Sequence, residues 1–143
     1  MLMKRNASAH WEGGLKDGKG TVSTQSGVLD KQQYSFGTRF ENGKGTNPEE
    51  LIGAAHAGCY SMALSMILGE KDLTADSIDT KADVTLEEVD GGFAVTAVHL
   101  TLTASIPGAD EKTFREAAEA AKKGCPISKL LNADITLDAM LKA

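Results

Sequence analysis

Short stretches in which apolar and polar residues alternate make up the first third of the chain, and glycines separate them. A period of two is typical of β-strands, and glycine clusters mark the turns between strands. Segments 8–14 and 18–27 are therefore predicted to form strands. Segment 32–41, "QQYSFGTRFE", is predicted to be a further strand, with Arg39 on the same face as Ser35.

A long helix is predicted next, in "TNPEELIGAAHAGCYSMALSMILGE". Asn47 is a suitable N-cap, Pro48 is a suitable first residue, and two glutamates in the first turn suit the helix dipole. Gly69 is predicted to end the helix. Residues 51–68 carry no formal charge, and the length of this stretch is at the lower limit for a membrane-spanning helix. Because glycine, serine, histidine and tyrosine interrupt this stretch, a buried central helix is the better interpretation.

The alternating pattern returns in segment 77–108, and the turn at Gly91 divides it into a predicted β-hairpin. Segment 110–124 has the pattern of an amphipathic helix between an aspartate cap and a terminal glycine. A short helix is predicted to start at Pro126, and segment 133–141 is predicted to form a final strand.

These elements predict a single α+β domain over residues 1–143, with antiparallel sheets around a long buried central helix. The net charge of −5 and the pI near 5.2 exclude a nucleic-acid-binding protein, which needs a basic surface. No apolar run follows the cationic start, so no signal peptide is expected. Two cysteines in a chain of this length are not a disulfide scaffold. We therefore expect a cytoplasmic protein that binds neither nucleic acid nor membrane.

The two cysteines are the first candidates for chemistry. Cys59 lies inside the predicted long helix, where a free cysteine is more often a small buried apolar residue than a reactive one. Cys125 directly precedes a proline at a predicted helix start, where free N–H groups and the helix dipole favour a thiolate. The alternative is that Cys125 only caps the turn after Gly124. Sequence spacing does not tell whether the two thiols meet.

Three further residues are candidates for the site. Taken alone, Glu49 is an ordinary first-turn acid, and Arg39 is a solvent-directed arginine whose stem packs on a sheet. His56 lies three residues before Cys59 and could share a metal site with it. No set of ligands with metal-binding spacing accompanies them, so no metal or organic cofactor is expected.

Longer motifs go beyond these patterns: "GTNPEELIGAAHAGCYSMAL", the downstream "GCPIS" and the early "HWEG". Together they strongly resemble the OsmC branch of the OsmC/Ohr family, the osmotically inducible and organic-hydroperoxide-resistance proteins. The likeness extends from "AHWEGGLKDGKGTVSTQSGVL" to "ADITLDAML". One departure is Gly58, where alanine is common beside the cysteine, and it concerns packing rather than chemistry.

The resemblance implies a thiol-dependent peroxidase that reduces organic hydroperoxides in oxidative and osmotic stress, as an intertwined homodimer with active sites at the subunit interface. Cys59 would be the peroxidatic cysteine and Cys125 the resolving one, so the cycle would pass through a sulfenic acid and an intramolecular disulfide. Glu49 would orient Arg39 toward the sulfur. A dithiol reductant such as a lipoylated protein would reopen the disulfide.

A nearby arginine would explain why a reactive cysteine lies in a helix of the core. A thiol with a pKa of about 8.5 is only a few per cent thiolate at pH 7, and burial lowers that fraction further. A guanidinium in contact reverses the effect, and a carboxylate neutralises and aims the guanidinium. Two alternatives stay open: a non-catalytic dimeric binding or structural module with buried cysteines, and a small metal-binding protein that uses His56 and Cys59.

Overall fold

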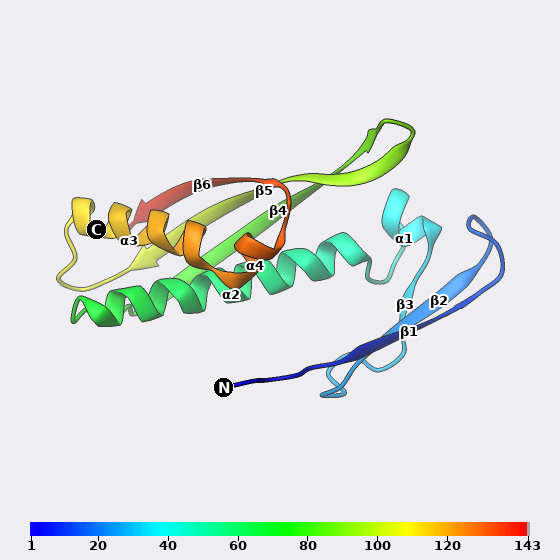
Figure 1. Ribbon diagram of the computed structural model, residues 1–143, viewed down its shortest axis with the longest axis horizontal. Helices are drawn as coiled ribbons and strands as arrows, with labels where there is room; N and C mark the ends of the chain where they lie inside the picture. Colours follow the sequence, from blue (N-terminus) through cyan, green and yellow to red (C-terminus); the bar gives the residue numbers. More distant parts are fainter. Residues whose placement is uncertain (143) are drawn as a thin grey trace. The chain divides into compact units, whose positions relative to one another are not determined.

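The computed structural model describes residues 1–142, which divide into two compact units. The N-terminal unit is Met1–Leu51 and the C-terminal unit is Ile52–Ala143. The elements along the chain are β1 (Ala7–Glu12), β2 (Lys19–Thr24), β3 (Gln32–Tyr34), α1 (Phe36–Phe40), α2 (Pro48–Glu70), β4 (Ser77–Val89), β5 (Gly92–Ser105), α3 (Glu111–Gly124), α4 (Pro126–Leu130) and β6 (Asp134–Leu141) (Figure 1).

Strands β1, β2 and β3 form an antiparallel sheet in the N-terminal unit, which confirms the first two predicted strands. Gly20 in β2 is paired with Trp11 on one side and with Tyr34 on the other. A Cβ atom at Gly20 would lie 2.5 Å from the Trp11 ring and 2.7 Å from the Tyr34 ring. Glycine is therefore needed here, because it lets the two rings approach to 5.4 Å between centroids across the middle strand.

The predicted strand over segment 32–41 is wrong beyond Tyr34, because the chain turns into helix α1. Ser35 caps this helix: its hydroxyl accepts the Thr38 N–H at 3.3 Å, and its own N–H donates to the Thr38 hydroxyl at 2.7 Å. These local side-chain bonds satisfy backbone groups that a strand would have to pair elsewhere. Arg39 consequently lies in the last turn of a helix and not on a sheet face.

Helix α2 begins as predicted, because the Asn47 side chain accepts the Glu50 N–H at 2.8 Å. Its buried residues recur at helical spacing and so share one face: Gly53, His56, Tyr60, Leu64 and Leu68. Within this chain, the predicted burial of the central helix is therefore confirmed for this one face of α2.

The opposite face of α2 is apolar as well but exposed to solvent. Met62 is 76% exposed and Met66 is 65% exposed, and Ala54 and Gly58 are also exposed. By length and composition α2 meets the requirements of a membrane-spanning helix, as the core helices of water-soluble proteins also do. A helix that is apolar all round is expected to be covered on both faces.

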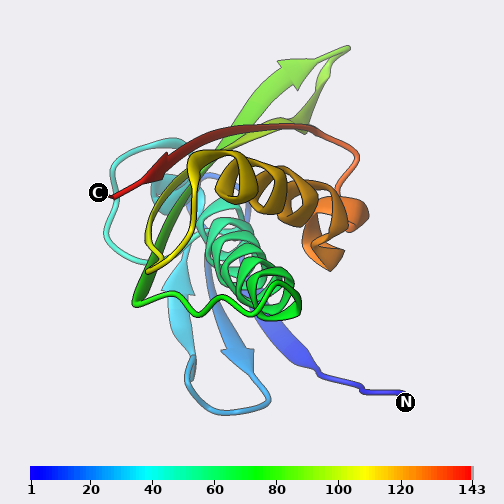
Figure 2. The same ribbon diagram turned by 90° about the vertical axis from the view of Figure 1, so that its left-hand side faces the viewer.

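The C-terminal unit places helices α2 and α3 on one face of the sheet β4-β5-β6 (Figure 2). Strands β4 and β5 form the predicted hairpin. Strand β6 pairs in parallel with β5, so this sheet is mixed and not purely antiparallel as the sequence suggested. The crossover through α3 and α4 supplies the long connection that a parallel neighbour requires.

The core of this unit lies between the sheet and the two helices. Alternate residues of β5 face the helices and are buried, from Val98 to Ala104. Phe114 and the alanines of α3 fill the same layer. The Tyr60 hydroxyl donates to the Ala118 carbonyl at 2.9 Å and so ties α2 to α3 beside Cys59. This bond positions the helix whose end leads directly to Cys125.

Candidate active site

The fold brings the two cysteines together, although they are 66 residues apart in sequence. Cys59 is half-buried on α2, and Cys125 is fully buried at the start of α4. Both are free thiols, and they lie close enough that Cys125 affects the ionisation of Cys59. Cys125 is held by its own N–H, which donates to the Ala121 carbonyl at the end of α3 at 2.9 Å. Neighbouring free thiols are the groups from which a disulfide forms.

The electrostatic setting of Cys59 within this unit works against the thiolate. Burial raises the pKa of the Cys59 thiol, and the neighbouring Cys125 thiol raises it further. The backbone N–H of Ile127 opposes this, because it donates to the Cys59 sulfur and lowers the pKa. Ile127 lies in the first turn of α4, where backbone N–H groups lack partners within the helix. A thiolate at pH 7 therefore needs a cation in addition to this N–H.

A histidine and a serine join the two cysteine-bearing helices one turn away from the thiols. The Nε2 atom of His56 lies 2.7 Å from the Ser128 hydroxyl oxygen, and both residues are buried. Burial lowers the pKa of His56, so the ring is neutral at pH 7. Its Nδ1 atom has no hydrogen-bond partner among the described residues. Because a buried N–H without an acceptor is the costlier defect, we assign the proton to Nε2, which donates to Ser128.

Arg39 and Glu49 form the second pair of predicted residues that the fold brings together. The guanidinium of Arg39 donates from Nε to one Glu49 carboxylate oxygen and from Nη2 to the other, both at 2.9 Å. This two-point geometry fixes the plane of the guanidinium as well as its position. The Glu49 side chain is only 13% exposed, so the arginine is held by a largely buried acid.

The wall around Arg39 is aromatic. A pocket of about 200 Å³ in the N-terminal unit is lined by Trp11, Tyr34, Phe36, Phe40 and Arg39, together with Leu15 and Ser35. The Arg39 guanidinium carbon lies 5.4 Å from the centre of the Phe40 ring, and the Phe36 and Phe40 rings lie 4.9 Å apart. An apolar hollow with one cation in its wall suits a molecule with an apolar body and a polar end.

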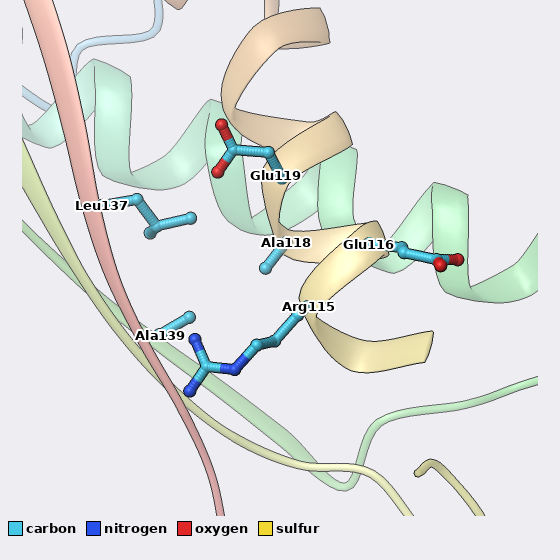
Figure 3. A pocket seen from close by; sticks show the side chains of 6 residues that line it. All are labelled: Arg115, Glu116, Ala118, Glu119, Leu137 and Ala139. Atoms are coloured by element: carbon cyan, nitrogen blue, oxygen red, sulfur yellow. The ribbon is translucent and has the colours of Figure 1, made fainter. Parts of the chain in front are cut away.

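A different pocket, of about 380 Å³, lies between α3 and β6 (Figure 3). Arg115 and Glu119 from α3 point into it beside Leu137 and Ala139 from β6, while Glu116 points away. Arg115 is already paired with Glu111 at 3.1 Å. The residues that line this pocket carry no thiol, so it is separate from the chemistry at Cys59.

The four candidate site residues lie in the structure as two pairs. Cys59 meets Cys125 in the C-terminal unit, and Arg39 meets Glu49 in the N-terminal unit. The sequence did not predict that the backbone of Ile127 lowers the pKa of Cys59, or that Ser128 is the hydrogen-bond partner of His56. The one signal in the sequence is spacing: His56 is three residues before Cys59, and Ser128 is three residues after Cys125. Residues of the 1–142 range include no cluster of three or more His, Cys, Asp or Glu that could hold a metal ion.

Two neighbouring thiols on helices of a unit with a small mixed sheet are the groups that dithiol–disulfide chemistry requires. The model of the family described as "OsmC-like protein" matches residues 41–139. The chain is also 58% identical over 143 residues, the full length of both chains, to Peroxiredoxin OsmC of Escherichia coli (strain K12). This chain therefore belongs to the OsmC-like protein family, as the motifs around the cysteines indicated.

More distant relatives share the fold. The organic hydroperoxide resistance protein OhrB of Bacillus subtilis (strain 168) is 31% identical over 124 residues, which are 86% of this chain and 89% of the relative. The crystal structure of Bacillus subtilis OhrB superposes with a TM-score of 0.65 at 27% identity, over 96% of this chain and 98% of that one. The α+β fold class predicted from the sequence is thus confirmed.

Proposed function

We propose that this protein is a thiol-dependent peroxidase that reduces organic hydroperoxides to alcohols in oxidative and osmotic stress defence. The observation that carries the proposal is the proximity of Cys59 and Cys125, two free thiols of which the second affects the pKa of the first. Membership of the OsmC-like family supports it, since relatives carry the names peroxiredoxin and organic hydroperoxide resistance protein. We further propose that residues 1–143 act as one OsmC-like domain in the cytoplasm.

In the proposed cycle the Cys59 thiolate attacks the terminal oxygen of the hydroperoxide. The sulfur–oxygen bond forms as the oxygen–oxygen bond breaks, and the departing alkoxide takes up a proton and leaves as the alcohol. Cys125 then attacks the sulfur of the resulting sulfenic acid, forms the disulfide and expels water. A dithiol reductant, of the lipoyl type, restores both thiols by exchange.

Arg39 is proposed to act on the Cys59 sulfur, and Glu49 to hold Arg39 in place. Support comes from the direction of the thiol's pKa: burial raises it, so the site needs a fixed cation to make the thiolate dominant at pH 7. The two-point ion pair provides a guanidinium with a fixed orientation. The same cation would stabilise the charge on the departing oxygen.

The aromatic pocket beside Arg39 supports an organic substrate over hydrogen peroxide. The full-length protein with a dithiol reductant is expected to consume cumene hydroperoxide at least about tenfold faster than hydrogen peroxide, because the aryl group buries apolar surface that hydrogen peroxide lacks. Initial rates of peroxide loss at equal concentrations measure this ratio. Equal and slow loss of both peroxides would instead support a non-catalytic binding or structural module.

We also propose that the protein is a homodimer. The exposed apolar face of α2, which includes Met62 and Met66, supports this because a second copy would cover it. Sedimentation velocity is expected to give twice the chain mass of 15.0 kDa. Met66→Glu should shift the protein toward the monomer, since the charge would be buried in the interface. A wild-type protein that sediments as a monomer would contradict the proposal.

A further inference from the structure

The disulfide-forming step needs Cys125 to stay close to Cys59, and helix α4 has few means of its own to hold that position. It has only five residues, too few for a stable isolated helix. Leu130 is 74% exposed, Ile127 packs partly buried against the core, and Ser128 is buried. The place of α4 against α2 therefore depends on the contacts of Cys125, Ile127 and Ser128.

The hydrogen bond between His56 and Ser128 is the buried polar contact that joins these two helices. His56 is one turn before Cys59 on α2, and Ser128 is one turn after Cys125 on α4. Two links therefore cross between the helices at neighbouring turns, one between the thiols and one between imidazole and hydroxyl. The thiol link changes whenever Cys59 is oxidised or reduced, whereas the His56–Ser128 bond involves no sulfur.

We propose that the His56–Ser128 hydrogen bond holds α4 against α2 so that Cys125 remains within disulfide distance of Cys59. His56 and Ser128 are then positioning residues for disulfide formation; their place in a peroxidase cycle rests on the function proposed above. A disulfide tolerates only about 4.4–6.8 Å between Cα atoms, so a small shift of α4 would slow its formation. In that step the Cys125 sulfur bonds to the Cys59 sulfur, the sulfur–oxygen bond breaks, and hydroxide leaves as water with the Cys125 proton.

The direct test is the equilibrium of the Cys59–Cys125 disulfide with glutathione, measured on the full-length protein by acid quench, alkylation and mass spectrometry. Ser128→Ala removes the hydroxyl and is expected to lower the effective concentration of the two thiols by about tenfold, the size of one net hydrogen bond. That change corresponds to a reduction potential about 30 mV higher. Ser128→Thr keeps a hydroxyl and should restore the wild-type value.

Two further variants separate positioning from general loss of stability. His56→Phe keeps a ring of similar size without a buried unpaired nitrogen, and it should show the same tenfold loss as Ser128→Ala. Ser61→Ala is the matched control, since Ser61 bonds Thr80 of β4 at 2.7 Å from the same helix. It should leave the equilibrium within about twofold of wild type. Folded Ser128→Ala and His56→Phe proteins that both titrate like wild type would overturn the proposal.

The glutathione experiment does not require peroxidase activity, so the two proposals can fail separately. With cumene hydroperoxide as oxidant, Ser128→Ala should form the Cys59 sulfenic acid at the wild-type rate, trapped with dimedone, and close the disulfide about tenfold more slowly. If the wild-type protein does not react with peroxide but the variants shift the glutathione equilibrium, the peroxidase proposal is refuted and the positioning role is supported. If the wild-type protein turns over peroxide but the variants do not shift the glutathione equilibrium, the positioning role is refuted and the peroxidase proposal is supported.

Discussion

Cys59→Ser is expected to abolish peroxide consumption, lowering the rate by roughly three orders of magnitude or more, because a serine hydroxyl is not ionised near neutral pH. Cys59 is only half-buried whereas Cys125 is buried, and the backbone of Ile127 lowers the pKa of Cys59, so Cys59 is the better candidate for the attack on the peroxide. The measurement is the rate of cumene hydroperoxide loss with a dithiol reductant in excess. A Cys59→Ser protein with more than a tenth of the wild-type rate would exclude Cys59 as the nucleophile.

Cys125→Ser is the partner variant and should behave differently. Cys125 is fully buried, so it meets the oxidised Cys59 and not the substrate. The variant is expected to complete its first turnover at the wild-type rate, stop as the sulfenic acid, and lose sustained turnover. Stopped-flow kinetics and intact-protein mass after one equivalent of peroxide distinguish these steps. If Cys125→Ser failed already in the first turnover, the roles of the two cysteines would have to be revised.

Arg39→Ala is expected to raise the pKa of the Cys59 thiol, because it removes the cation proposed to act on the sulfur. The sign follows from the charge: a guanidinium favours the thiolate, so its removal favours the thiol. At pH 7, below the thiol pKa of the variant, the thiolate should change from the dominant to the minor form, and the peroxide rate should fall by about tenfold or more. At pH values above both pKa values the alkylation rates of variant and wild type should converge.

The pH profile of iodoacetamide alkylation of Cys59, measured in a Cys125→Ser background, reads this pKa directly. Glu49→Gln should give a smaller shift in the same direction, because Arg39 keeps its charge but loses its two-point anchor. Arg115→Ala is a suitable control, since Arg115 is also paired with a glutamate but lines the pocket between α3 and β6. An unchanged profile in Arg39→Ala would remove Arg39 from the site.

Much of the C-terminal unit could be predicted from the sequence because its signals are local. The Asn47 cap, the Asp110 cap and the turn at Gly91 each act within four residues, and they set the bounds of α2, α3 and the hairpin. The same holds for the start of α4 at Pro126. The period of hydrophobic residues then assigns each face, which explains why the fold class was correct.

Segment 32–41 shows where such local reasoning fails. Its alternation of polar and apolar residues fits a strand, but the reciprocal bonds between Ser35 and Thr38 start a helix after Tyr34. Alternation over a few residues carries too little energy to outweigh a satisfied cap. Arg39 was therefore placed on the wrong element, and its role, which the family resemblance implies, stays a prediction.

The sequence by itself determined the order of the elements apart from α1, the two cysteines as candidates and, through its motifs, the family. Only the tertiary structure decided that Cys59 meets Cys125, that β6 lies parallel to β5, and that His56 bonds Ser128 across 72 residues. The physical reason is the distance along the chain over which each kind of interaction acts. Caps and periodicity act between neighbours along the chain, whereas contacts between distant residues depend on how the apolar faces of α2, α3 and the sheet pack together.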